Sequence, residues 1–121
     1  MMSSNENWVS ICQTNDLVDN SGVCALVNGE QVALFKLTQG EQEQVLAISN
    51  FDPIGKANVL YRGLICSVSG EDTPLRYVVA SPLYKQRFCL TTGECIDDPE
   101  QSVSVFPARI VDEMVQLSVA S

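Results

Sequence analysis

Cysteine is plentiful in this chain and histidine is absent, and together these facts limit the chemistry that it can perform. The five cysteines contain no C-x-x-C pair, so their spacing matches no zinc or iron–sulfur motif. Without histidine the chain cannot build a Ser-His-Asp or Cys-His nucleophile, nor a histidine-ligated metal site. In a reducing compartment the cysteines are expected to stay reduced and to pack as small apolar side chains.

Two short proline-containing stretches remain as candidate sites. Asp52-Pro53-Ile54 lies within Asn50–Leu60, which has no clean period, and Ser81-Pro82 opens a second irregular stretch that ends near Tyr84. Proline fixes its own backbone angle and lacks an amide donor, which predicts a loop at both places. Aspartate and serine before proline are also ordinary turn residues, so the residue types alone assign no metal role to them.

The elements that must position these loops are predicted to be strands. No window of ten residues or more has a helical period, whereas short apolar runs alternate with turn residues throughout, which indicates an all-β sandwich or small barrel. Asn28-Gly29 is a strong hairpin signal, and Pro107 predicts an edge strand or a bulge. The predicted strands are Trp8–Cys12, Val23–Val27, Gln31–Leu37, Val45–Ser49, Tyr61–Val68 (with Gly63 as a bulge), Arg76–Ala80, Gln86–Leu90, Val103–Val111 and Met114–Val119, and Thr38–Gln44 is predicted to be a loop.

The basic residues gather in the middle of an acidic chain. The formal net charge is −8, which argues against a nucleic-acid partner. Residues 56–87 hold five bases and two acids, a charge of +3, and the rest of the chain is therefore −11. These bases either form a solvated face or dock an acidic partner. The docking candidates are Lys56, Arg62, Lys85 and Arg87, whereas Lys36 lies outside the segment and its reversal to Glu is expected to change partner binding little.

The two loops resemble the cluster-binding loops of Rieske proteins. Those proteins carry Cys-x-His in the first loop and Cys-Pro-x-His in the second, and here Asp52, Ile54, Ser81 and Tyr84 stand at the four ligand positions. The interval between the loops and the closing F-P-A-R-I-V-D-E-M-V-Q-L also fit a Rieske domain. The resemblance implies a Rieske-like antiparallel β-sandwich with two vestigial loops. A [2Fe–2S] cluster needs thiolates and imidazoles at these positions, so no cluster and no other metal is expected.

One family resembles this chain in keeping the Rieske frame without the ligands: the small subunit of bacterial assimilatory NAD(P)H-dependent nitrite reductase. The similar stretches are F-D-P-I-G-K-A-N-V-L-Y-R-G-L (Phe51–Leu64) and V-A-S-P-L-Y-K-Q-R-F (Val79–Phe88). The resemblance implies a cytoplasmic, non-catalytic subunit that acts in nitrate assimilation and has no activity alone. Its partner would be a large subunit with FAD, an iron–sulfur cluster and siroheme, which reduces nitrite to ammonium.

Two other readings stay open. The chain could be a Rieske-type ferredoxin with an atypical metal site built from Asp52, Ser81 and Cys66 or Cys89, or a Rieske-like adaptor for another reductase or oxygenase. Residues 1–7 are expected to be a disordered N-terminus, and residues 8–121 to form one domain. No stretch has the roughly 20 apolar residues of a membrane helix, so no membrane partner is expected.

Overall fold

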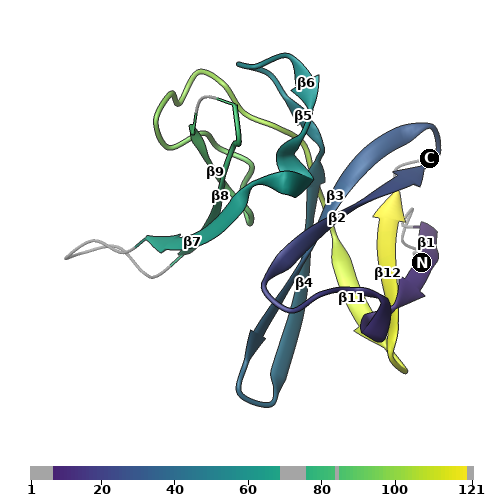
Figure 1. Cartoon of the computed structure of the whole chain (residues 1–121). Coiled ribbons are helices and arrows are strands. Elements are labelled where there is room, and N and C mark those ends of the chain that lie inside the picture. The colour runs from purple at the N-terminus through teal and green to yellow at the C-terminus, as the bar shows by residue number, and fades with distance from the viewer. Residues whose placement is uncertain (1–6, 69–75, 84, 120–121) are drawn as a thin grey trace, which may run out of the picture.

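Strands make up most of the chain, as predicted (Figure 1). The computed structural model describes residues 7–68, 76–83 and 85–119, so the predicted disordered N-terminus falls outside them except for Asn7, which belongs to β1. The strands are β1 (Asn7–Gln13), β2 (Ser21–Val27), β3 (Glu30–Gln39), β4 (Gln42–Ser49), β5 (Phe51–Asp52), β6 (Ala57–Asn58), β7 (Leu64–Val68), β8 (Arg76–Ala80), β9 (Arg87–Cys89), β10 (Val105–Phe106), β11 (Ala108–Val111) and β12 (Met114–Val119).

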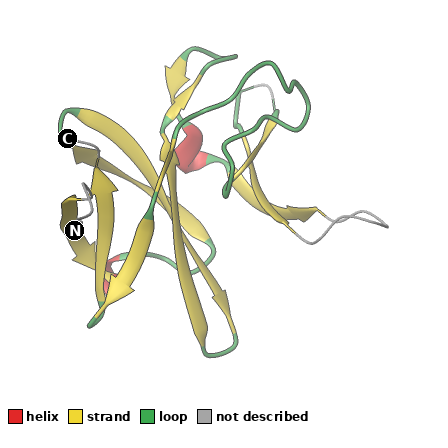
Figure 2. Ribbon diagram, turned by 180° about the vertical axis from the view of Figure 1, so that it is seen from behind, coloured by secondary structure: helices red, strands yellow, loops and turns green. Residues whose placement is uncertain are grey.

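The helical structure within the described ranges consists of two single 3-10 turns, η1 (Thr14–Asp16) and η2 (Leu60–Arg62). No helix in those ranges is long and apolar enough to cross a membrane. The strands pair antiparallel within the sheets β1-β12-β11, β10-β4-β3-β2, β5-β6 and β7-β8-β9, and the described strands close no barrel (Figure 2). The prediction of an all-β, antiparallel fold is confirmed, and of its two forms the sandwich is the one observed.

The central hairpins follow the local turn chemistry. Asn28 and Gly29 both have positive φ, 50° and 83°, as a tight turn between twisted strands requires. The next hairpin corrects a prediction, because Thr38–Gln44 is not a loop: β3 and β4 pair through Gln39↔Gln42 and turn only at Gly40 and Glu41. The polar composition of this stretch is that of a hairpin end that projects beyond the core (Figure 1).

Strand β3 separates two apolar cores. Successive side chains of a strand point to opposite faces, so Val32 and Leu34 pack into one core and Ala33 and Phe35 into the other. The first core also contains Val115 and Leu117 from the terminal strand β12. The second core contains Val79 and Phe88 from the sheet β7-β8-β9, and Leu90, which directly follows β9. The sandwich therefore packs on both faces of one central sheet.

Pro107 marks the place where the chain changes sheets. The predicted strand Val103–Val111 is broken there, since β10 pairs with β4 in the central sheet and β11 pairs with β12 in the terminal sheet. Proline cannot donate to a strand ladder, but its carbonyl accepts a hydrogen bond from the Ser118 amide at 2.9 Å. Both β10 and β11 are edge strands of their sheets, so the expectation of an edge strand at Pro107 is confirmed, whereas the prediction of one continuous strand is wrong.

The strand predicted at Tyr61–Val68 begins only at Leu64. Ahead of it, η2 is held by Asn50, whose side-chain oxygen accepts from the Tyr61 amide at 2.8 Å and whose carbonyl accepts from the Leu60 amide at 3.1 Å. Gly63 lies between η2 and β7, where a side chain would meet the Ala80 carbonyl. This close approach, and not a bulge, explains the glycine.

Lys36 is a structural residue. Its side chain is buried, and its amino group lies 3.0 Å from the Asp19 carboxylate, 2.9 Å from that of Glu43 and 3.2 Å from the Thr14 carbonyl. The two carboxylates raise the pKa of Lys36 above its ordinary value. Reversal of this charge would place a third carboxylate beside two others, so Lys36→Glu should destabilise the fold and is unsuitable as a control for binding.

Candidate functional site

The first loop is organised by the buried side chain of Asp52. One carboxylate oxygen accepts hydrogen bonds from the Ile54 amide at 2.8 Å and the Gly55 amide at 3.0 Å. Its carbonyl accepts from the Lys56 amide at 2.6 Å, which closes the turn between β5 and β6. Aspartate followed by proline favours this local geometry, since the short side chain caps amides two and three residues on.

The second loop has the same construction around Ser81. This residue is also buried, and its hydroxyl oxygen accepts from the Leu83 amide at 3.3 Å. Its carbonyl accepts from the Lys85 amide at 3.0 Å, and its own amide donates to the Gln86 carbonyl at 2.8 Å. Tyr84 lies outside the described residues, so the fourth predicted ligand position is not placed by the structure.

The two loops meet directly. The Ser81 hydroxyl donates a hydrogen bond to the second carboxylate oxygen of Asp52 at 2.5 Å. Gly55 lies against the side chain of Leu83, so that a side chain at position 55 would collide with it. The structure therefore brings the predicted positions Asp52 and Ser81 together, with Ile54 half-buried at the edge of the second core.

This arrangement does not suit an iron–sulfur cluster. Both oxygens of Asp52 are occupied by protein donors, Ile54 has no donor atom, and Ser81 offers a hydroxyl where a thiolate would be needed. In the part of the chain that the structure describes, no three Cys, Asp or Glu side chains gather closely enough to hold a metal ion. The residues present therefore do not fit the cofactor of a Rieske protein.

Cys66 and Cys89, the thiols of the alternative metal site, lie elsewhere. Both occur on the small sheet, where Cys66 pairs with Val78 and Val78 with Cys89, so one strand separates the two residues. Cys66 is exposed and Cys89 is buried. Contrary to the expectation that all five cysteines pack inside, Cys24 is exposed as well.

Two of the four docking candidates are already engaged within the chain. Arg87 forms a two-point ion pair with Asp97, at 3.1 Å and 2.8 Å, and its amide also donates to that carboxylate. These hydrogen bonds hold the pKa of Asp97 below its ordinary value. Arg62 donates from Nε to the Tyr61 hydroxyl at 3.0 Å and lies over the Tyr61 ring.

Lys56 and Lys85, the other two candidates, are exposed at the ends of the two loops. Neither forms a salt bridge with any residue that the structure describes. Their charges are thus available to a partner, whereas that of Arg87 is largely compensated by Asp97.

Apolar side chains accompany these lysines, and the sequence alone did not reveal them. Leu64 is 74% exposed, Leu83 45% and Phe51 43%. A hollow of about 200 Å³ lies beside the second loop, lined by Arg62, Gly63, Leu64, Ala80, Ser81, Pro82 and Lys85. Exposed apolar residues next to uncompensated charges are typical of a protein interface. Nothing in the sequence pattern of β7 distinguished Leu64 from a core residue.

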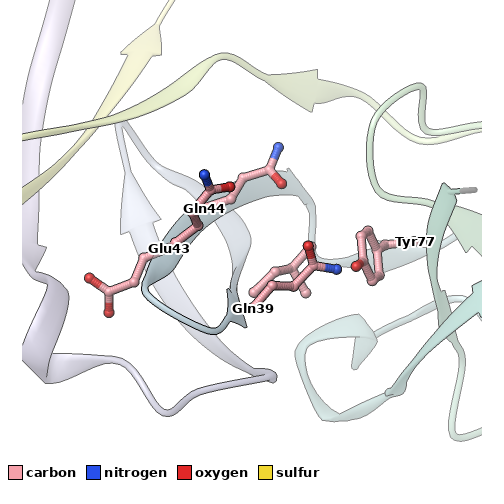
Figure 3. A pocket seen from close by; sticks show the side chains of 6 residues that line it. Gln39, Glu43, Gln44 and Tyr77 are labelled. Atoms are coloured by element: carbon pink, nitrogen blue, oxygen red, sulfur yellow. The ribbon is translucent and has the colours of Figure 1, made fainter.

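Another pocket lies between the end of the β3–β4 hairpin and β8 (Figure 3). Leu37, Gln39, Gln42, Glu43, Gln44 and Tyr77 line it, and the Tyr77 ring faces Gln39 in the close view. Amide side chains and one carboxylate provide neither a nucleophile nor a metal-ligand set. It contains none of the candidate residues.

Comparisons with known proteins agree with this geometry. Residues 7–118 match the family model of the Rieske-like [2Fe-2S] domain. Together with the sheets and the two facing loops, this match defines a Rieske-type domain. The chain is 48% identical over 110 residues to the nitrite reductase (NADH) small subunit of Salmonella typhimurium, covering 91% of this chain and 95% of that one. The chain belongs to this family of small subunits.

Two further relatives are informative. The NMR structure of the Escherichia coli protein NirD superposes with a TM-score of 0.82 at 44% identity, covering 96% of this chain and 99% of that one. The nitrite reductase [NAD(P)H] large subunit of Klebsiella oxytoca is 37% identical over 103 residues, which is 85% of this chain and 10% of that protein. In that protein a domain similar to this chain is therefore part of the large-subunit polypeptide.

Proposed function

We propose that the chain is the small, non-catalytic subunit of a cytoplasmic NAD(P)H-dependent nitrite reductase and docks on its large subunit through the two facing loops. The observation that carries the proposal is the 48% identity to a nitrite reductase small subunit over nearly the full length of both chains. The Klebsiella oxytoca large subunit supports it, since a domain of this kind is covalently joined to a large subunit there.

The site favours a docking role over a redox role. Asp52 and Ser81 hydrogen-bond to each other, and Asp52 also accepts from the Ile54 and Gly55 amides. These residues therefore offer no set of metal ligands suited to the cluster. Electron transfer would then rest on the partner, which we expect to carry FAD, an iron–sulfur cluster and siroheme. The exposed lysines and leucines at the loop ends provide the polar and apolar contacts of an interface.

Co-purification tests this proposal. The tagged chain is expressed with the nitrite reductase large subunit of the same organism, and the complex is isolated and assayed for NAD(P)H-dependent nitrite reduction. We expect the large subunit to be recovered with the chain, and the chain alone to be colourless, iron-free and inactive. Failure to recover the large subunit, or stoichiometric iron and sulfide in the isolated chain, would overturn the proposal.

A further inference from the structure

The two loops are twins in sequence and in hydrogen bonding. Asp52–Lys56 reads D-P-I-G-K and Ser81–Lys85 reads S-P-L-Y-K, so each begins with a polar residue and proline and ends with lysine. In each loop the first side chain accepts the amide of the third residue, at 2.8 Å in one and 3.3 Å in the other. In each, the first carbonyl accepts the lysine amide. The Asp52–Ser81 hydrogen bond then joins the twins at their first residues.

Both lysines also share an unfavourable backbone conformation. Lys56 has φ of 58° and Lys85 has φ of 64°, in the left-handed region where a Cβ is disfavoured. Elsewhere the described residues place Gly29, Gly40 and Gly93 in this region, and also Asn20, Asn28, Asp112 and Glu113. Strained positions of this kind cluster at functional sites, and the two lysines differ from the others in that each ends one of the two facing loops. Neither lysine forms a salt bridge within the described ranges, so both ammonium groups are candidates for contact with a partner.

The position of the pair indicates what it meets. The β5–β6 hairpin and the connection between β8 and β9 lie at the same end of the molecule, opposite the tip of the β3–β4 hairpin (Figure 1). Leu83 lies beside Gly55 and is 45% exposed. Leu64 is 74% exposed and lines the hollow together with Lys85. A nucleic acid is an unsuitable partner for a chain of net charge −8. Leucines beside two exposed lysines suit a protein surface with carboxylates around an apolar patch.

We propose that Lys56 and Lys85 act as a matched pair that binds carboxylates on the large subunit, with Leu64 and Leu83 packing against an apolar patch between them. The proposal rests on the proposed function and specifies its contact. Lysine is disfavoured in the left-handed conformation of both positions, so the proposal gives a functional reason for its presence there. Each lysine ends its loop, and the Asp52–Ser81 hydrogen bond joins the two loops.

Glycine substitution separates the backbone conformation of these positions from the charge of their side chains. The double variant Lys56→Gly with Lys85→Gly relieves the backbone conformation and removes both ammonium groups. We expect its melting temperature to be equal to or above that of the wild type, while its Kd for the large subunit rises about tenfold. We also expect its Kd to depend less on salt, because two of the screened contacts are gone. Thermal unfolding and titration against purified large subunit at two salt concentrations measure these effects.

Three variants complete the test. Glu113→Gly is the matched control, because Glu113 is exposed, charged and left-handed at φ of 67° but belongs to the β11–β12 turn; it should bind like the wild type. Lys56→Gln with Lys85→Gln removes the charges without the backbone change and should weaken binding equally. Lys56→Arg with Lys85→Arg keeps the charges and should restore affinity to within about twofold.

The outcomes are distinct. Wild-type binding that persists unchanged in the Gly and Gln double variants overturns the lysine pair and leaves the proposed function standing. Absence of binding by the wild type overturns the proposed function and the lysine pair with it. Weakened binding in both double variants, with the Arg variant and Glu113→Gly unaffected, is the result that the proposal requires.

Discussion

The hydroxyl of Ser81 donates to the carboxylate of Asp52 at 2.5 Å, and both side chains are buried. At the two positions where a Rieske protein would carry its cysteine ligands, one hydrogen bond joins the two loops. It connects residues 29 apart in the chain.

Removal of either partner should destabilise the fold. Ser81→Ala leaves one buried oxygen of Asp52 without its side-chain donor, so we expect the free energy of unfolding to fall by about 1–3 kcal/mol. Asp52→Ala also deprives the Ile54 and Gly55 amides of their acceptor and should cost at least as much. Urea unfolding of both single variants and the double variant should show a coupling of about 1 kcal/mol or more.

Ser67→Ala is the control for this cycle, because Ser67 is exposed on β7. Its effect should stay within about 0.5 kcal/mol. Strictly additive effects of Asp52→Ala and Ser81→Ala would show that the hydrogen bond does not connect the loops energetically.

The buried ammonium of Lys36 should tolerate neither deletion nor reversal. Lys36→Met leaves Asp19 and Glu43 facing each other without their shared cation, and Lys36→Glu adds a third carboxylate. We expect both variants to unfold at lower urea concentration than the wild type, with the larger loss for Lys36→Glu. Lys56→Met, at an exposed position, should leave the midpoint unchanged. A wild-type midpoint for Lys36→Glu would contradict the structural role.

Acid should weaken the fold partly through Asp97. Hydrogen bonds from Arg87 lower the pKa of this carboxyl in the folded chain. The resulting stability is fully present above the unfolded pKa, near about 4, and is lost as the pH falls through the lower folded value. Asp97→Asn should therefore be less stable than the wild type at about pH 7. It should also lose less stability between about pH 5 and pH 3, the range in which the Asp97 carboxyl becomes protonated.

Urea titrations at several pH values across that range measure the effect. Asp19 contributes in the same direction through Lys36 and remains in the variant, so the acid dependence should decrease and not vanish. Asp112→Asn serves as the control, because its carboxylate forms no salt bridge with a described residue. An acid dependence identical in Asp97→Asn and the wild type would show that the Arg87 pair contributes nothing.

Thiol labelling should distinguish the cysteines by burial. Cys24 and Cys66 are exposed, Cys12 is half-buried, and Cys89 and Cys95 are buried. An aromatic disulfide reagent should therefore react quickly with two thiols of the native chain and reach five only after unfolding. Cys24→Ser and Cys66→Ser should each remove one fast-reacting thiol. Fast reaction of all five in the native chain would indicate that the second core is open to solvent.

The sequence predicted what depends on neighbouring residues and missed what depends on the fold. The Asn28-Gly29 turn and the edge position of the strands at Pro107 are consequences of local backbone chemistry, and both occur as predicted. Thr38–Gln44 was misassigned because its strands extend past the core, where apolar alternation is no longer required.

The candidate site shows the same division. The sequence located Asp52 and Ser81, since loops at prolines follow from residue type. It could not show that the two side chains are in contact. Nor could it show that Arg87 forms an ion pair with Asp97 while Lys85 forms none with a described residue, because these facts depend on how distant strands pack. The left-handed conformation of Lys56 and Lys85 has no sequence pattern of its own, since glycine or asparagine is the usual residue there.

The position of β3 between two cores has a consequence for how the molecule opens. Its side chains alternate between the cores, so separation of β3 from its partners β2 and β4 would disrupt both cores at once. The amides at the centre of β3, near Ala33 and Leu34, should exchange with deuterium only through global unfolding. The loops at Asp52 and Ser81 lie outside this shared strand and can open locally at lower free energy. The end of the molecule that carries the loops should thus adjust its shape while the centre of the sandwich stays closed.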